Sequence, residues 1–195
     1  MDVQGSAAAG PVWLWLANHL RLVIALTFFA SVLLAVFTAW RLISLAQEQR
    51  MARLVLAGRG AVAAPVLRRL AASPLAMSST HYLYGKALAE TGDLAGAARE
   101  LQLAVAKAGG LPDVAARYEL GTVLFREGRV IDGRAQLLIA LGYFGEYARD
   151  LLQLGDDLWR DGQVAAARAA WEIVVARGLS PWAGAAEERL RRHPP

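Results

Sequence analysis

Leu88–Leu94 (LAETGDL), Leu124–Val130 (LFREGRV) and Leu158–Val164 (LWRDGQV) are three versions of one seven-residue pattern. In each version a helical pattern runs up to a Gly, and an aliphatic residue two positions later begins the next helical pattern. A Gly in this place can adopt the left-handed backbone conformation that closes a helix. Together with Gly58, these Gly residues are spaced by 34, 36 and 34 residues. The spacing predicts repeated pairs of helices joined by tight turns.

A second set of Gly residues lies seven positions before the turns, at Gly85, Gly121 and Gly155. Gly inside a helix costs about 1 kcal/mol relative to Ala. Its recurrence therefore predicts that the first helix of each pair lies directly against the second. The buried face expected for the second helices consists of Ala97, Leu101, Ala104, Gly133, Leu137, Ala140, Ala167, Trp171 and Val174.

These patterns resemble the tetratricopeptide repeat, a 34-residue helix–turn–helix unit. The resemblance covers residues 79 to about 178 and implies an all-α solenoid of about three repeats. The sequence departs from the family pattern in its first helices, where His81, Arg117 and Leu151 replace the usual aromatic residue. Residues 141–145 form an irregular junction after the second repeat.

Two further segments extend the predicted array. Ala63, Leu67 and Leu70 are in register with the second helices, so residues 43–78 are expected to form a degenerate leading half-repeat. Its first helix, residues 44–57, continues an apolar segment without a linker, so we expect that helix to run on into the array and fix its orientation beside the bilayer. At the other end, Ser180 and Pro181 predict the start of a capping helix, with Ser as the cap and Pro at the first helical position.

The apolar segment is Leu22–Trp40 (LVIALTFFASVLLAVFTAW), which holds no charge and lies between Arg21 and Arg41. As a helix it spans roughly 30 Å, the thickness of the hydrocarbon core of a bilayer. It is longer than the core of a signal peptide and is not preceded by a basic segment, which favours an uncleaved anchor. Aromatic rings suited to the headgroup region flank it at Trp13, Trp15 and Trp40.

The expected organisation is therefore an N-terminal tail with an interfacial helix (1–21), a transmembrane helix (22–42), the leading half-repeat (43–78), and the repeats with the capping helix (79–195). The layout is that of a single-pass protein of the bacterial inner membrane. Arg41, Arg50 and Arg53 follow the span and only Arg21 precedes it, so the positive-inside rule favours a cytoplasmic repeat domain. A periplasmic domain remains the alternative, because a domain of this size can be translocated despite such charges.

Several classes of chemistry are not expected. Without Cys there is no disulfide, thiolate nucleophile or Cys-based metal site. The three His residues do not form a metal-binding pattern, and we expect no metal, no cofactor and no enzymatic activity. The net charge is +4 and the pI about 9.8, but the basic residues are scattered among acids. This scatter predicts a solvated surface, or a patch for anionic lipids, and no nucleic-acid partner.

The family resemblance implies a concave groove, lined by the first helices, that binds a peptide or a helix. The family's groove register selects Tyr82, Lys86, Glu90, Tyr118, Thr122, Phe125, Arg126, Leu152, Asp156, Trp159 and Arg160. The Asn residues with which the family binds acidic chaperone tails are absent. Interleaved aromatic rings and mixed charges favour an apolar helix or an extended segment as the ligand.

The leading functional hypothesis is a membrane-anchored scaffold that binds a protein partner for recruitment or for assembly of a membrane complex. One alternative is a permanent accessory subunit of a respiratory, photosynthetic or secretion complex, contacting other subunits through its transmembrane helix. Another is a chaperone-like binder of client proteins. Membrane lipids are expected partners in each case.

Overall fold

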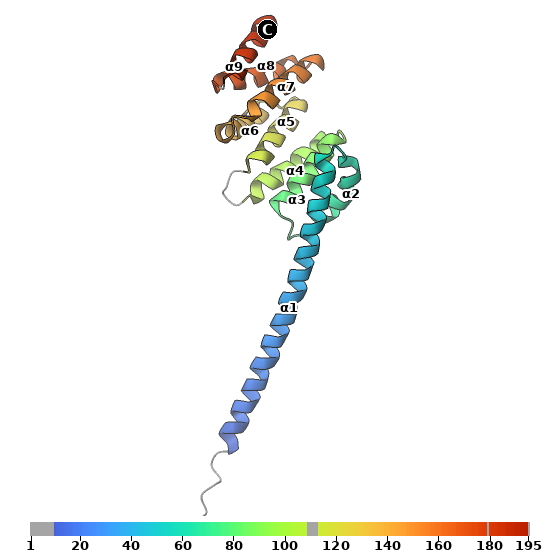
Figure 1. The fold of residues 1–195 in the computed structure, drawn as a ribbon, viewed down its shortest axis with the longest axis vertical. Helices are drawn as coiled ribbons and strands as arrows, with labels where there is room; N and C mark the ends of the chain where they lie inside the picture. The colour runs from blue at the N-terminus through green and yellow to red at the C-terminus, as the bar shows by residue number, and fades with distance from the viewer. Residues whose placement is uncertain (1–9, 109–112, 179, 195) are drawn as a thin grey trace, which may run out of the picture. The chain divides into compact units, whose positions relative to one another are not determined.

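The computed structural model describes residues 10–108, 113–178 and 180–194, without the side chains of 10–14 and 16–18 (Figure 1). Within these ranges the chain is all-helical, as predicted, and has no strand. It divides between Gln47 and Glu48 into two compact units. Helix α1 (Gly10–Leu56) is continuous across this boundary, which agrees with the absence of a linker. The two units are described separately.

The first unit is the part of α1 up to Gln47. Residues His19–Leu56 are long and apolar enough to cross a bilayer, by length and composition. In the most apolar 18-residue stretch of this segment, 0% of the residues are buried. The core helix of a globular domain is, by contrast, mostly buried. The hydroxyls of Thr27, Ser31 and Thr38 donate to carbonyls one turn earlier, so they expose little unsatisfied polarity.

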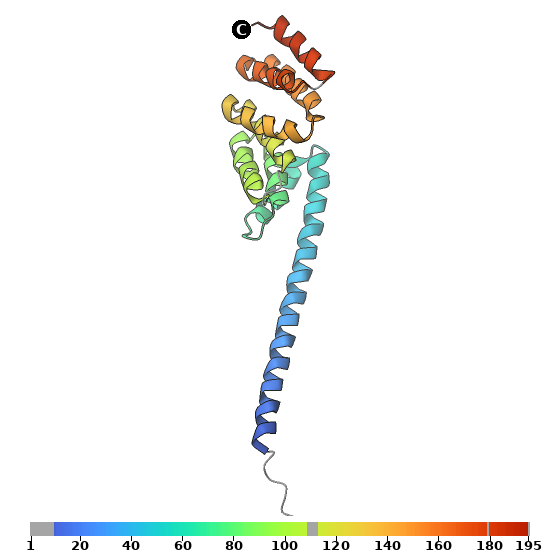
Figure 2. The ribbon, with the colours of Figure 1, turned by 90° about the vertical axis from the view of Figure 1, so that its left-hand side faces the viewer.

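The second unit begins with the end of α1 and contains the helix pairs (Figures 1 and 2). Its remaining helices are α2 (Gly60–Ala71), α3 (Ser78–Glu90), α4 (Leu94–Lys107), α5 (Val114–Arg126), α6 (Val130–Tyr143), α7 (Tyr147–Arg160), α8 (Val164–Ala176) and α9 (Trp182–Arg192). The pairs α3–α4, α5–α6 and α7–α8 form hairpins, and the first helices contact one another in the order α3, α5, α7, α9. The first helices therefore present a continuous face.

The turn glycines have the predicted left-handed backbone. Gly58, Gly92, Gly128 and Gly162 have φ values between +68° and +86°. Gly178 repeats this conformation after α8, with φ +62°. In each predicted turn the amide after the Gly donates to a carbonyl of the preceding helix, as Arg129 does to Leu124. This bond satisfies a carbonyl that the helix end would otherwise leave without a partner.

The helical glycines confirm the predicted close approach within each hairpin. A Cβ atom placed on Gly121 would lie 2.5 Å from Cγ of Leu137, and one on Gly85 would lie 2.7 Å from Cγ of Leu101. At Gly155 the indole of Trp171 occupies the corresponding space. The predicted buried residues of the second helices are all inaccessible to solvent or nearly so.

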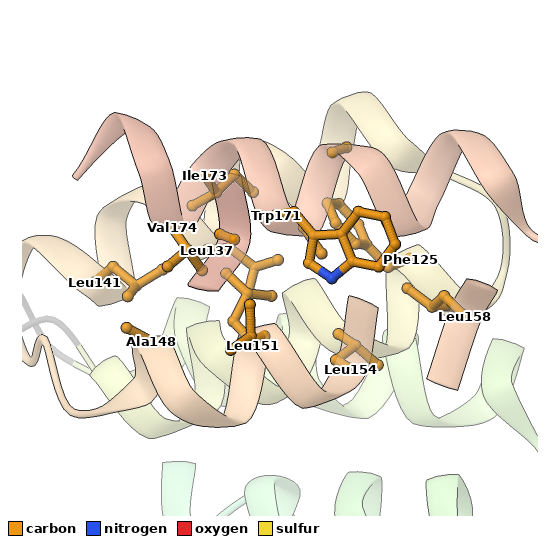
Figure 3. Close-up of a cluster of buried hydrophobic side chains, with 14 of the residues drawn as sticks. Phe125, Leu137, Leu141, Ala148, Leu151, Leu154, Leu158, Trp171, Ile173 and Val174 are labelled. Atoms are coloured by element: carbon orange, nitrogen blue, oxygen red, sulfur yellow. The ribbon is translucent and has the colours of Figure 1, made fainter. Parts of the chain in front are cut away.

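The largest core extends from α5 to α9 (Figure 3). Trp171 is 1% exposed. In Figure 3 it lies between Phe125 and Leu158 on its right and Leu137 and Leu151 on its left. A smaller core joins the end of α1 to α2 and α3 through Val55, Ala63 and Leu67 and neighbouring side chains. The degenerate leading unit thus shares a buried core with α3, the first helix of the first repeat.

The capping helix begins one residue later than predicted. Helix α9 starts at Trp182, and Pro181 occupies the cap position with no side-chain hydrogen bond. Ser180 is therefore not the cap, and the prediction of a Ser cap was wrong. Ala186 is buried against α8 and α7, while Glu188 forms ion pairs with Arg191 and Arg192 on the outer surface.

Candidate interaction face

Three tyrosines from successive first helices form the centre of the candidate site. Tyr82 comes from α3, Tyr118 from α5 and Tyr147 from α7. The rings of Tyr118 and Tyr147 stack, with centroids 4.3 Å apart and planes at 12°. Phe144 meets Tyr147 edge-on at 6.4 Å and is 50% exposed. Tyr118 is 8% exposed, whereas Tyr82 and Tyr147 are half-buried. We call Tyr82, Tyr118 and Tyr147 the tyrosine face.

An ion pair between Lys86 and Glu119 joins α3 to α5 next to the tyrosine face. Both side chains are about three-quarters buried. Burial alone lowers the pKa of Lys86, but the charge of Glu119 and its hydrogen bond outweigh burial and raise that pKa above its ordinary value. The attraction between the two charges therefore links α3 to α5.

The carboxylates around the tyrosine face give it a negative character. Burial raises the pKa of Tyr118, and the charges of Asp150 and Glu119 raise it further. The pKa of Tyr82 is raised by burial and then by Glu119. The phenol of Tyr147 has a raised pKa for the same two reasons. Among the described residues no group is hydrogen-bonded to these three phenol oxygens. Tyr82 and Tyr147 are half-buried, so a ligand can reach part of each ring, whereas Tyr118 is buried.

A cleft of about 370 Å³ opens at the edge of the tyrosine face. It is lined by Glu146, Tyr147, Arg149 and Asp150 of α7 and the residue before it, and by Trp182 of α9. Trp182 is half-buried, and both carboxylates are exposed. The cleft places an indole and a phenol next to two acids and one Arg, so acids are in slight excess. This arrangement favours cations and planar apolar groups.

Besides Tyr118, three of the predicted groove residues are buried. Phe125 is 0% exposed and Leu152 is 5% exposed. Phe125 fills the space that a side chain at Gly133 would need, so its ring turns inward. Thr122 is 9% exposed and donates its hydroxyl to the carbonyl of Glu119. In this structure the three side chains are buried, and their contact with a ligand stays a prediction.

Trp159 is half-buried, and its contact with a ligand stays a prediction. Its ring lies between the core residue Trp171, at 5.9 Å, and His193, which follows α9, at 4.1 Å. The last turn of the chain therefore covers it, and it is only partly accessible. Trp171 packs in the hairpin as predicted.

The remaining predicted residues are accessible to different degrees. Glu90 is exposed and accepts a hydrogen bond from the amide of Gly60, 2.7 Å away. Asp156 binds Arg189 of α9 through two hydrogen bonds. Arg126 and Arg160 are exposed, and Arg160 pairs with Asp157 on its own helix. Only Tyr82, Lys86 and Tyr118 belong to one contiguous cluster.

Sequence reasoning missed Tyr147, Glu119, Glu146 and Asp150. Tyr147 lies before the first position of the repeat register, because Phe144 adopts an extended backbone and α7 begins after it. The concentration of aromatic residues at 143, 144 and 147 is the signal that could have revealed the site. Groups of three or more potential metal ligands are absent among the described residues.

Comparison with known proteins supports the repeat assignment. Residues 53–112, from the end of α1 through α4, match the model of the tetratricopeptide repeat. The repeat region is tetratricopeptide-like. The match begins earlier than the predicted resemblance and includes part of the leading unit. It ends at residue 112, before the second predicted repeat. Tetratricopeptide repeats are generally non-catalytic modules that bind other proteins, so the match indicates an interaction role. A search of curated proteins finds no match.

Proposed function

We propose that this chain is a membrane-anchored tetratricopeptide scaffold of the bacterial inner membrane. Its tyrosine face holds a protein partner for recruitment or for assembly of a membrane complex. The observation that carries this proposal is the cluster of Tyr82, Tyr118 and Tyr147 on three successive first helices. Tyr82 and Tyr147 are half-buried, and the buried Tyr118 stacks on Tyr147. Rigid aromatic side chains with unpaired hydroxyls give much contact area at a small entropic cost.

The anchor rests on the composition and exposure of α1. An apolar window with no buried residue is costly in water, and insertion into lipid removes that cost. Trp15 and Trp40, 60% and 40% exposed, flank the window at positions suited to the two interfaces. Trp13 belongs to α1, but its side chain lies outside the described residues.

The charge distribution supports a cytoplasmic repeat domain. Residues 41–75 hold six Arg and one Glu, and residues 76–195 hold 14 basic and 15 acidic residues. The net positive charge of the chain therefore lies in the segment after the apolar span. Among the described residues, no acid pairs with the exposed side chains of Arg50, Arg53, Arg59, Arg68 and Arg69. Positive charge left unpaired after a span is typical of the cytoplasmic side.

Purification of the full chain from its native membrane in mild detergent tests this function. We expect a partner to co-purify with the unaltered chain and to be lost from Tyr147→Ala, which removes a half-buried ring while leaving α7 helical. Leu103→Ala is the matched control, because Leu103 is 43% exposed on the second helix α4. Equal recovery of the partner with Tyr147→Ala would contradict the tyrosine face as the binding surface. A partner at one copy per chain would support a permanent subunit, and a variable set of partners would support a chaperone.

A further inference from the structure

The groups around the tyrosine face define the charge of its ligand. We infer that the tyrosine face and the adjoining cleft bind a cationic protein segment, one that presents Arg or Lys side chains. This inference rests on the proposed function, and it narrows the partner from a protein segment in general to one of stated charge.

Acids outnumber basic groups among the charges that act on the tyrosine face. The acids are Glu119, Asp150, Glu146 and Asp113, and the basic groups are Lys86 and Arg126. Lys86 is paired with Glu119, and in the cleft Arg149 lies 3.6 Å from Asp150 with both side chains exposed. The surface therefore has a small local excess of negative charge, although the whole chain carries a net charge of +4.

The cleft combines acids with aromatic rings. A guanidinium or ammonium group binds the face of a tyrosine or tryptophan ring and also donates to carboxylates and phenol oxygens. In the cleft, Tyr147 and Trp182 supply the rings, and Glu146 and Asp150 supply the acceptors. The phenol oxygens of the half-buried Tyr82 and Tyr147 add further acceptors. An acidic segment would meet like charges, which accords with the absence of the family's clamp for acidic tails.

A charge-matched peptide series tests the inference on the full chain in an uncharged detergent. Three twelve-residue peptides share one Leu/Ala frame and carry four Arg, four Ser or four Glu. We expect the Arg peptide to bind about tenfold more tightly than the Ser peptide and the Glu peptide to bind most weakly. Binding of the Arg peptide should weaken as salt is raised, because exposed charges are screened.

Paired variants locate the binding. Glu146→Gln combined with Asp150→Asn should weaken binding of the Arg peptide about tenfold. Asp161→Asn combined with Glu187→Gln makes the same change of charge at exposed positions outside the cleft and should leave binding unchanged. Circular dichroism of each variant confirms that the helices are intact.

The outcomes separate this inference from the proposed function. Equal binding of the Arg and Ser peptides, or preference for Glu, would overturn the cationic ligand. An equal effect of the two double variants would overturn the location. If no peptide binds but a partner in cells crosslinks to the tyrosine face, the cationic inference fails and the proposed function stands. If crosslinking also fails, both fail.

Discussion

Nδ1 of His81 lies 2.8 Å from Oε2 of Glu100. This contact joins α3 to α4 inside the first hairpin. His81 is 4% exposed. The second hairpin has Arg117 and Gln136 at the same separation of 19 residues, with a bond of 2.9 Å. The third has the buried apolar residues Leu151 and Ala170. At the positions where the family has an aromatic residue, each first helix therefore has a residue that pairs with the second helix of its hairpin. The pairs are polar in the first two hairpins and apolar in the third.

We expect the His81–Glu100 pair to behave as a unit in stability measurements. Glu100→Ala leaves the buried imidazole without its partner and should lower the free energy of unfolding by about 1–3 kcal/mol. Adding His81→Leu removes the unpaired group and should restore most of that loss, because Leu is the residue of the third hairpin. Denaturation of the full chain in mild detergent measures the effect. Simple addition of two losses in the double variant would contradict the coupling.

The close approach of helices within a hairpin can be tested at Gly121. Gly121→Ala places a methyl group 2.5 Å from Leu137 and 3.0 Å from the carbonyl oxygen of Gly133. We expect a loss of about 1–3 kcal/mol from overpacking. Gly184→Ala in α9 is the control, since nothing lies within 4 Å of its added methyl group. The control should be neutral or stabilising by up to about 1 kcal/mol, and an equal response of both variants would show that the hairpin tolerates separation.

Stability should decline at alkaline pH because of the tyrosine face. The folded pKa of Tyr118 is raised above the ordinary value of 10.0, chiefly by burial. Above about pH 10 the unfolded chain releases this proton and the folded chain retains it, so stability is full below that pH and falls above it, by up to about 1.4 kcal/mol per pH unit. The raised pKa of Lys86 acts in the same direction. Melting curves between pH 8 and 11 should fall less steeply for Tyr118→Phe than for the exposed control Tyr143→Phe.

The glycine pattern revealed much of the fold because backbone geometry leaves little choice at those positions. The left-handed turn after each first helix requires Gly. So does the position in the first helix where Leu137 or Trp171 packs against the backbone, because a side chain there would occupy the same space. The direction of individual side chains was harder to infer. Phe125 occupies a groove position of the family, but Gly133 leaves a hole in the facing helix and the ring fills it.

Much of the accessible part of the candidate site could not be predicted from the repeat register, because it is formed by residues at the ends of helices. The extended backbone at Phe144 sets where α7 begins and so brings Tyr147 onto Tyr118. The packing of His193 on Trp159 depends on how the last helix docks, and no local pattern encodes that. Tyr82, Lys86 and Tyr118 were predictable because they lie in the regular parts of α3 and α5.

Sidedness can be measured with alkaline phosphatase fused to the carboxyl end of the chain, since the enzyme is active only outside the cytoplasm. We expect an inactive fusion for the unaltered sequence. Replacing Arg41, Arg50 and Arg53 with Gln while adding two Arg residues before the span should make the fusion active, because the bias of positive charge is reversed. Activity of the unaltered fusion would place the repeats in the periplasm.

The most direct measurement is site-specific photo-crosslinking in intact cells, with the photoreactive residue placed in turn at Tyr82 and Tyr147 and, on the second helices, at Leu103 and Ile139. These four positions are all at least partly accessible. The account predicts one discrete crosslinked protein from the two tyrosine positions and none from the two controls. Crosslinks of equal yield from all four positions, or from Leu103 and Ile139 alone, would contradict a partner bound at the tyrosine face.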